Sequence, residues 1–233
     1  MSFIDGPRLS DESNLLTGEN PHAKESPLKD LLSEQLQDLL SAENQLVAAL
    51  PNMAEAAHEP KLKEVFSKHL QQTKGHVDRL ENALKVLGGP SEAKTCKAMK
   101  GIVEEGKETI EEGEDKDELT ADLALIAAAQ RVEHYEISGY GNAKCLAKQI
   151  GEREVANLLS QTLGEEEAAD FLLTTITQPI LQQATSVEFG NGTKAPWGEP
   201  GETGNTLITS AKARVAGVSS AAKFEVKPSN KKR

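Results

Sequence analysis

The sequence predicts an all-α protein, built as a bundle of four long helices that form two pairs joined by one long connection. Three observations predict this fold. Apolar residues recur at helical spacing in four stretches, the turns within each pair are very short, and only 3% of the 233 residues are aromatic while 37% are hydrophobic. A core of mainly Leu, Ala, Val and Ile is typical of helical bundles, whereas strands favour aromatic and β-branched residues. The composition therefore disfavours an all-β fold.

The first pair of helices is predicted over residues 26–87. A Ser-Pro pair at its start is typical of a helix N-terminus, and leucines near a 3.6-residue period follow it. Pro51 predicts a kink rather than an end, so the first helix should span 26–58. A Glu-Pro pair begins the second helix, over 60–87, and a Gly-Gly-Pro stretch from Gly88 stops it. Because the turn is so short, the two helices should be antiparallel.

The connection between the pairs, residues 91–118, is predicted to contain a short helix from about Lys94 to Glu112. Its last part is strongly acidic. Between Glu104 and Glu118, nine acidic residues and two lysines give a net charge of −7. We interpret this stretch as a solvated acidic face, and the alternative is that it captures cations on their way to a site.

The second pair is predicted over residues 119–150 and 152–178. Gly151 should end the first of these helices, and Pro179 should perturb the second near its end. Two antiparallel hairpins joined by a connection of roughly 30 residues give the ferritin-like topology with one long helical crossover, as opposed to an up-down-up-down bundle.

Outside the bundle, predicted to span 26–184, the sequence predicts flexible extensions. Residues 1–25 should form a disordered arm, and residues 185–233 a Gly/Pro-containing linker and a basic tail. From residue 190 onward, eight Lys or Arg and three Glu give a net charge of +5, whereas the whole chain carries −11. The acidic total disfavours nucleic-acid binding by the bundle, so a tether to nucleic acid or a partner through the tail is the weaker hypothesis. No signal peptide or spanning apolar run is visible, which predicts a cytoplasmic protein without a membrane partner.

Polar residues interrupt the core-facing stripes of all four helices at a common height. Most lie roughly 14 to 19 residues from the turn of their own hairpin, which at about 1.5 Å per residue places them in one layer near mid-bundle. The residues of this layer are Glu43, Gln72, His76, Glu133, Glu136, Glu166 and Asp170, with His69 on the same stripe as His76.

Burying several carboxylates together is costly unless a cation neutralises them or they share protons. Carboxylates with imidazole suit a pair of iron or manganese ions, with zinc as a further candidate. The alternative is a metal-free buried polar network, held by hydrogen bonds and by Arg79 or Arg131. The common height of the layer in four helices favours metal.

Two strings carry a resemblance to a known family. Residues 127–137 read Ala-Ala-Ala-Gln-Arg-Val-Glu-His-Tyr-Glu-Ile, and residues 162–170 read Thr-Leu-Gly-Glu-Glu-Glu-Ala-Ala-Asp. Together with shorter matches at 42–46, 69–73 and 96–99, they resemble the YciE/YciF family of ferritin-like proteins, over about residues 28–180.

The resemblance implies a dimeric, stress-associated bacterial protein with a rubrerythrin-like bundle and a two-metal centre. It implies two metal ions, with iron foremost, in a homodimer. The metal candidates are Glu43, His69, Gln72, His76, Glu133, Glu136, Glu166 and Asp170. Two departures stand out, because no Glu-x-x-His pair lies on the inner faces and Gln72 is neutral where relatives often have Glu. The sequence therefore leaves open whether the protein is an enzyme that reacts with peroxide, dioxygen or Fe(II), or a non-catalytic structural bundle.

Overall fold

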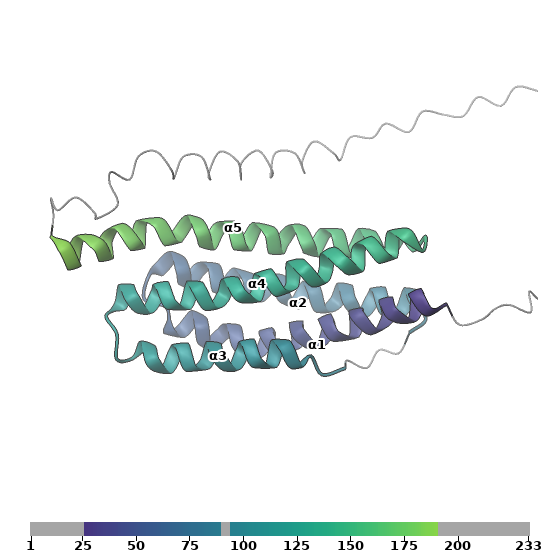
Figure 1. Ribbon diagram of the computed structural model, residues 1–233, viewed down its shortest axis with the longest axis horizontal. Coiled ribbons are helices and arrows are strands. Elements are labelled where there is room, and N and C mark those ends of the chain that lie inside the picture. Colours follow the sequence, from purple (N-terminus) through teal and green to yellow (C-terminus); the bar gives the residue numbers. More distant parts are fainter. Residues whose placement is uncertain (1–25, 90–93, 191–233) are drawn as a thin grey trace, which may run out of the picture.

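The structure, a computed structural model, describes residues 26–89 and 94–190, and these form five α-helices and no strand (Figure 1). The helices are α1 (Pro27–Ala56), α2 (Pro60–Leu87), α3 (Lys97–Gly113), α4 (Glu118–Gln149) and α5 (Arg153–Phe189). The predicted all-α fold is confirmed. The arm expected over 1–25, and the linker and tail from residue 191 onward, lie outside the described residues.

The four long helices form a closed bundle. Helix α1 packs against α2 and α4, and α5 packs against the same two helices, so that each long helix has two neighbours. Helix α3 lies outside this ring, against α1 and α4 (Figure 1). Because α2 ends at the opposite end of the bundle from the start of α4, the connection that contains α3 runs along its length. The predicted ferritin-like topology with one helical crossover is therefore confirmed.

Local sequence explains most of the helix ends, with one exception. Gly88 ends α2 and Gly151 follows α4, both with positive φ (69° and 86°), a conformation that glycine adopts without strain. Pro51 lies inside α1, as expected. The expected end near Gln178 is wrong, because α5 continues through Pro179 to Phe189. A proline removes only one helical hydrogen bond, and the flanking Ile176 and Ile180 are both buried in the core, which holds the helix in place.

A buried carboxylate fixes the turn between α1 and α2. Asp122, on α4, is 1% exposed and accepts hydrogen bonds from the backbone N–H groups of His58 (2.8 Å) and Glu59 (2.7 Å). Both N–H groups lie in the turn directly before α2, where no helical carbonyl is available to accept them. The contact ties the first hairpin to the second at this end of the bundle.

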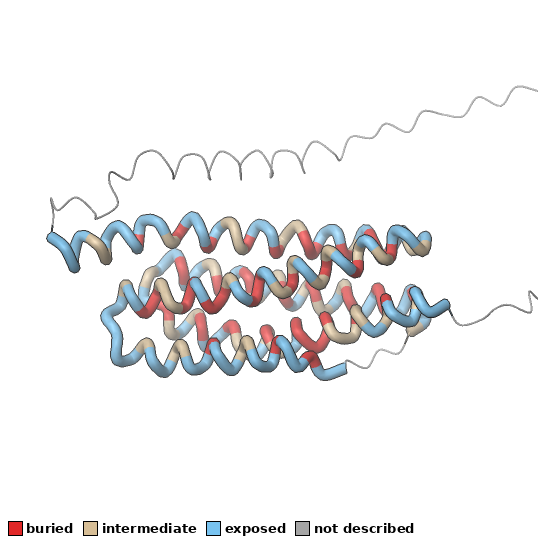
Figure 2. Tube along the Cα trace, in the orientation of Figure 1, coloured by how far each residue is buried: buried red, intermediate tan, exposed pale blue. Residues whose placement is uncertain are grey.

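The buried residues lie on the inward sides of the helices (Figure 2). The apolar ones form two clusters. One cluster lies toward the α1–α2 turn and includes Leu50 and Phe66. The other lies toward the α4–α5 turn and includes Leu36 and Leu84. Between them, buried polar residues form a layer at mid-bundle.

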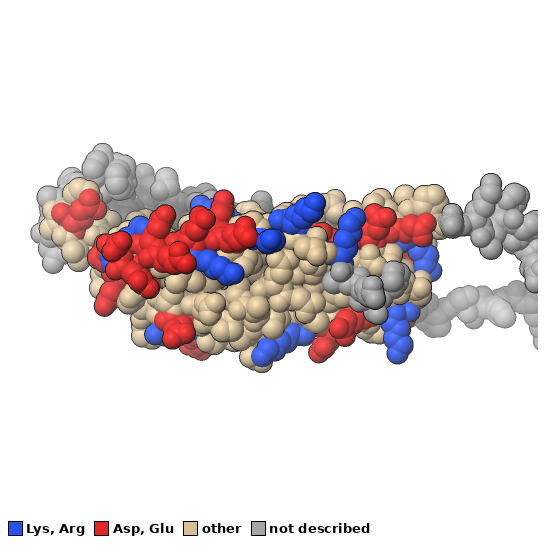
Figure 3. Space-filling model, turned by 90° about the horizontal axis from the view of Figure 1, so that it is seen from below, with Lys and Arg blue, Asp and Glu red and all other residues tan. Residues whose placement is uncertain are grey.

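The acidic stretch of the crossover faces outward. All nine acidic residues between Glu104 and Glu118 are exposed, and acidic side chains gather at one end of the face seen in Figure 3. This exposure agrees with a solvated acidic face. Within the described part of the chain, no helix combines the length and the apolar character that crossing a bilayer requires.

Candidate metal centre

Four glutamates are buried together in the mid-bundle layer. They are Glu43 on α1, Glu133 and Glu136 on α4, and Glu166 on α5. Glu133 is 3% exposed and the other three are fully buried. Helix α2 contributes His69 and His76, which are 4% and 0% exposed. The structure thus brings together carboxylates and imidazoles from four helices, at the height that the sequence spacing predicted.

The ligand atoms of these residues form two overlapping groups, in each of which all atoms lie within 4.8 Å of one another. The first group consists of His69, Glu133, Glu136 and Glu166. The second group consists of Glu43, His76 and Glu166. Glu166 belongs to both groups, and it offers one oxygen to each side. The arrangement therefore has two adjacent positions with a shared carboxylate between them.

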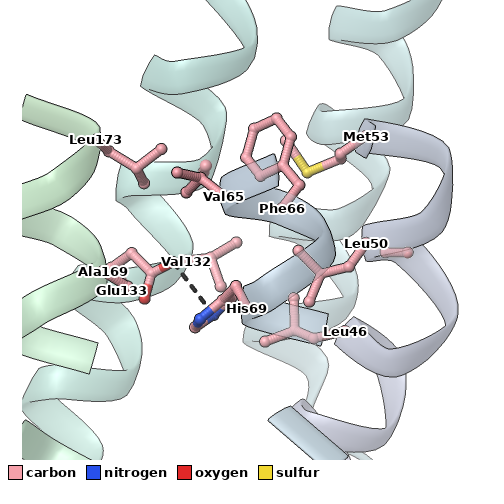
Figure 4. A pocket seen from close by; sticks show the side chains of 12 residues that line it. Leu46, Leu50, Met53, Val65, Phe66, His69, Val132, Glu133, Ala169 and Leu173 are labelled. Atoms are coloured by element: carbon pink, nitrogen blue, oxygen red, sulfur yellow. Dashed lines mark ion pairs between the residues drawn. The ribbon is translucent and has the colours of Figure 1, made fainter. Parts of the chain in front are cut away.

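Short contacts link the histidines to the glutamates. Nδ1 of His76 lies 2.7 Å from Oε1 of Glu166 and 3.3 Å from Oε1 of Glu43. Nε2 of His69 lies 3.3 Å from Oε1 of Glu133, a contact shown as the dashed line in Figure 4, and 3.7 Å from Oε2 of Glu166. Each histidine thus turns one ring nitrogen toward its group of carboxylates.

Many oxygens of this layer are buried without a hydrogen-bond donor among the described residues. Both carboxylate oxygens of Glu136 are in this condition, as is Oε2 of Glu43, of Glu133 and of Glu166. Oε1 of Glu166 contacts His76 instead. Leaving a buried polar atom unsatisfied costs about 1–3 kcal/mol, and more for a charged group. A cation held by these oxygens would remove that cost.

Neither arginine that the sequence suggested as a partner neutralises the buried glutamates. Arg131 is exposed. Arg79 instead donates hydrogen bonds to Glu165, with Nη1–Oε2 and Nη2–Oε1 distances of 2.8 and 2.9 Å. Tyr140 does contribute, because its hydroxyl donates a hydrogen bond to Oε1 of Glu43 from within the core.

Burial controls the protonation of the layer. Burial, together with repulsion from neighbouring carboxylates such as Glu166, raises the pKa of Glu133 and Glu136 well above the usual value. Burial also raises the pKa of Glu43, although the hydrogen bond with His76 opposes the effect. Without a cation, these carboxyl groups hold their protons more tightly than carboxyl groups in water do, so protons and cations compete for the same oxygens.

The pKa values of the two histidines are shifted in opposite directions. Burial lowers the pKa of His69, which favours a neutral imidazole with a lone pair free for a metal. For His76, burial also acts to lower the pKa, but the contacts with Glu166 and Glu43 together outweigh it and raise the pKa to about 10. His76 is therefore an imidazolium in the metal-free protein, and it balances part of the negative charge.

Glu165 supports His76 from the outer side. Its Oε2 lies 2.9 Å from Nε2 of His76, while Arg79 binds both of its oxygens. Histidines that ligate metals commonly have their other nitrogen bound to a carboxylate in this way. Glu165 is not among the metal candidates that the sequence predicts, because its contacts with His76 and Arg79 depend on the fold.

Gln72 and Asp170 lie at the margin of the layer. Gln72 is half-buried beside His69, where it acts to raise the pKa of that histidine. Asp170 is half-buried, accepts a hydrogen bond from Gln130 (2.9 Å) and lies 3.3 Å from His134. It belongs to neither group of ligand atoms. The six other candidates supply the two groups of ligand atoms, and they are Glu43, His69, His76, Glu133, Glu136 and Glu166.

The donor set fits two divalent ions. It offers four carboxylates and two imidazoles in two adjacent positions, and several of the buried carboxylate oxygens have no hydrogen-bond partner among the described residues. Iron, manganese and zinc all accept this mixture of oxygen and nitrogen donors.

Comparison with known proteins gives independent evidence about the family of this chain. The family described as Domain of unknown function (DUF892) matches residues 27–186. Protein YciF of Escherichia coli (strain K12) is 44% identical over 138 residues, which are 58% of this chain and 80% of that protein. These matches confirm the resemblance that the sequence motifs predicted.

Solved structures of similar proteins agree with these sequence matches. The crystal structure of the E. coli stress protein YciF aligns with a TM-score of 0.63 and 39% identity, over 67% of this chain and 98% of that one. YcfI from Rhodopseudomonas palustris aligns with a TM-score of 0.61 and 36% identity, over 66% and 97% of the two chains. A Dps protein from Bacillus brevis aligns with a TM-score of 0.52 over 66% of this chain and 99% of its own. At 16% identity, that likeness bears on the fold alone.

Proposed function

The chain belongs to the DUF892 family, and from this premise we propose that it is a ferritin-like, stress-associated protein that binds two metal ions at mid-bundle. The observation that carries the proposal is the set of four buried glutamates with unsatisfied oxygens. The stress association rests on the relative YciF, which is described as a stress protein. We expect the protein to act in the cytoplasm as a homodimer.

In this proposal, each residue of the centre has a definite task. His69, Glu133 and Glu136 would hold the first ion, Glu43 and His76 the second, and Glu166 would bridge them. Iron is the first candidate, with manganese or zinc as alternatives. A bound pair of iron ions would supply redox chemistry toward peroxide, dioxygen or Fe(II). The protein supplies the dry surroundings and the fixed positions of the donors.

The test is metal binding by the full chain. Purified protein is first treated with a chelator and is then titrated with Fe(II), Mn(II) or Zn(II) under anaerobic conditions. The bound metal is measured by elemental analysis after buffer exchange. We expect two ions per chain, and loss of most of this metal in Glu166→Gln, which removes the shared carboxylate. The matched control is Glu167→Gln, because Glu167 is the next residue along α5 and is exposed. Failure of all three metals to bind, or full binding by Glu166→Gln, contradicts the proposal.

A second candidate is a non-catalytic, structural bundle with a metal-free polar layer. The observation in its favour is that part of the layer is already neutralised, since Arg79, Glu165 and His76 form a chain of ion pairs that ends at Glu166. A layer of this kind fixes the register of the helices rather than a ligand. This candidate predicts that the protein binds no metal in the titration above. It also predicts that none of the three metals changes the thermal stability of the protein.

The basic tail is a separate proposal, because it lies outside the described residues. A tether to nucleic acid through residues 206–233 predicts retention of the full chain on DNA at low salt and release at higher salt. Deletion of 206–233 should abolish that retention, and unchanged retention of the shortened chain contradicts the tether.

A further inference from the structure

Three side chains form a hydrogen-bonded chain outside the candidate metal centre, where the start of α3 meets α1 and α4. The hydroxyl of Tyr135, on α4, donates a hydrogen bond to Oδ2 of Asp38, on α1, over an O–O distance of 2.7 Å. Sγ of Cys96, the residue directly before α3, lies 2.9 Å from the same hydroxyl oxygen. A phenol has one hydrogen to donate, and Tyr135 gives it to Asp38. The thiol of Cys96 is therefore the donor in the second contact.

The surrounding structure holds Cys96 in this position. The residue is 1% exposed, its backbone N–H donates to Oγ of Ser41 (2.9 Å), and its carbonyl accepts from Nε2 of Gln45 (3.1 Å). Its sulfur also accepts the backbone N–H of Met99 at 3.4 Å, which caps the start of α3. The sulfur is thus fixed against the phenol and shielded from solvent.

The chemistry of a nucleophilic thiol does not suit Cys96. Burial raises the pKa of the thiol, and the thiolate is the form that attacks peroxides and disulfides. The other cysteine of the chain, Cys145, is exposed and lies about 15 Å beyond Tyr135 along α4. A disulfide requires Cα atoms within about 7 Å of each other. Cys96 is therefore better placed to give a hydrogen atom to the phenol than to attack an oxidant.

The phenol, in contrast, can be reached from outside. Tyr135 and Asp38 line a groove of about 260 Å³ between α1 and α4, and Cys96 is not among the lining residues. Burial, together with the contacts to Cys96 and Asp38, raises the pKa of Tyr135, so its hydroxyl keeps its proton at neutral pH. A small oxidant in the groove thus meets a protonated phenol that has a proton acceptor on one side and a thiol on the other.

We propose that Tyr135, Asp38 and Cys96 form a radical relay that reduces one-electron oxidants entering this groove. In the first step the oxidant takes one electron from Tyr135, and the phenolic O–H bond breaks as its proton moves to Oδ2 of Asp38. In the second step the S–H bond of Cys96 breaks, and its hydrogen atom moves to the phenoxyl oxygen and restores the O–H bond.

The two steps balance. The oxidant gains one electron, Asp38 gains one proton, and Cys96 is left as a thiyl radical, while Tyr135 returns to its starting state. Thiol S–H and phenolic O–H bonds have similar strengths, so the second step needs little driving force. Each transfer follows a contact of the structure, 2.7 Å for the proton and 2.9 Å for the hydrogen atom. The relay requires no metal, so it goes beyond the proposed function.

The experiment uses the metal-free full chain. A light flash generates a one-electron oxidant from a ruthenium(II) tris-bipyridine complex and persulfate, and EPR spectroscopy of the frozen sample measures the tyrosyl radical. We expect several-fold more tyrosyl radical in Cys96→Ser than in the unmodified chain, because the serine O–H bond is too strong to give up its hydrogen atom. Cys96→Ala also lacks a transferable hydrogen and should show the same increase. Cys145→Ser is the matched control and should behave as the unmodified chain does.

Two further variants, each combined with Cys96→Ser, identify the radical and its proton acceptor. Tyr135→Phe should remove the signal, because the other tyrosine of the chain, Tyr140, is fully buried. Asp38→Asn should slow radical formation several-fold, because an amide accepts a proton far less readily than a carboxylate. Glu34→Gln is its control, since Glu34 lies one helical turn before Asp38 and lines the same groove.

Two results overturn the relay. One is an equal yield of tyrosyl radical in the unmodified chain and in both Cys96 variants. The other is a signal that persists when Tyr135→Phe is combined with Cys96→Ser. Metal binding is measured on the same preparations, so the two proposals fail separately. A relay in a protein that binds no metal contradicts only the metal centre, and two bound ions in a protein without the relay contradict only the relay.

Discussion

His76 Nδ1 lies 2.7 Å from Glu166 Oε1 in the interior of the bundle, so a histidine of the first hairpin contacts the one glutamate that both ligand groups share. With a pKa of about 10, this imidazole is protonated in the metal-free protein. The proton on His76 therefore supplies part of the positive charge that a metal ion would otherwise supply. Metal binding at this position requires that the proton leave, so the affinity should rise with pH.

The first prediction concerns the pH dependence of stability without metal. The pKa of His76 is about 10 in the folded state against 6.5 ordinarily, so its contribution is complete below about pH 6.5 and is lost as the pH rises through about 10. The raised pKa values of Glu133 and Glu136 act in the same direction, with contributions complete below their ordinary value of 4.5. The lowered pKa of His69 acts oppositely, but its contribution is lost only as the pH falls below 6.5.

We therefore expect the free energy of unfolding of chelator-treated protein to fall between about pH 7 and pH 10, by about 2–5 kcal/mol. Denaturant titrations at a series of pH values measure it. Added metal should reduce the slope, because it replaces the protons. A free energy of unfolding that is constant or rises over this range contradicts the protonation described here.

The second prediction concerns Glu136, whose two oxygens are both buried without a hydrogen-bond partner among the described residues. Glu136→Gln removes a buried group that is costly to ionise, so the metal-free variant should be more stable at pH 8, by about 1–3 kcal/mol. The same variant should lose much of the rise in melting temperature that metal gives the unmodified protein. Thermal unfolding with and without metal measures both effects, with exposed Glu167→Gln as the control.

The third prediction concerns Glu165, which binds His76 from outside the centre. Glu165→Gln keeps the shape of the side chain but removes the charge that orients and polarises the imidazole. We expect about a 10–100-fold loss of affinity for one of the two metal ions, with the other ion less affected. Competition with a chelator of known affinity measures the two steps. Glu154→Gln, an exposed position on the same helix, should bind both ions normally, and an equal loss in both variants rules out a specific role for Glu165.

The fourth prediction concerns Asp122, which accepts the backbone N–H groups of His58 and Glu59. Asp122→Ala leaves these groups without their partner, so the variant should lose about 2–4 kcal/mol of stability. Asp122→Asn retains one acceptor oxygen and should lose less. The comparison is Asp117→Ala, which removes an exposed cap at the start of α4 and should cost about 1 kcal/mol. Similar losses for Asp122→Ala and Asp117→Ala contradict the proposed tie between the hairpins.

The height of the centre could be predicted from the sequence, because the rise per residue and the short turns fix it. The direction in which each side chain points around its helix is harder to predict from the sequence. On α2 the buried stripe contains His69, Thr73 and His76, whereas Gln72 is rotated toward the margin. Near Pro179, local propensity suggested an end to the helix, and packing of the neighbouring isoleucines overrides it.

Other features could not be predicted, because they depend on contacts between distant parts of the chain. The contact of Glu165 with His76 and Arg79 joins residues more than eighty positions apart. The contact of Asp122 with the backbone of His58 and Glu59 likewise joins residues more than sixty positions apart. Neither leaves a pattern within any single helix.

The crossover divides the chain into two hairpins, and each of them brings three of the six residues of the centre. The first supplies Glu43, His69 and His76, and the second supplies Glu133, Glu136 and Glu166. Sliding one hairpin past the other by a single helical turn, about 5.4 Å, would separate ligand atoms that now lie within 4.8 Å of one another. A metal ion bound at this centre would therefore stabilise only the correct alignment of the two hairpins, because a misaligned chain could not retain it.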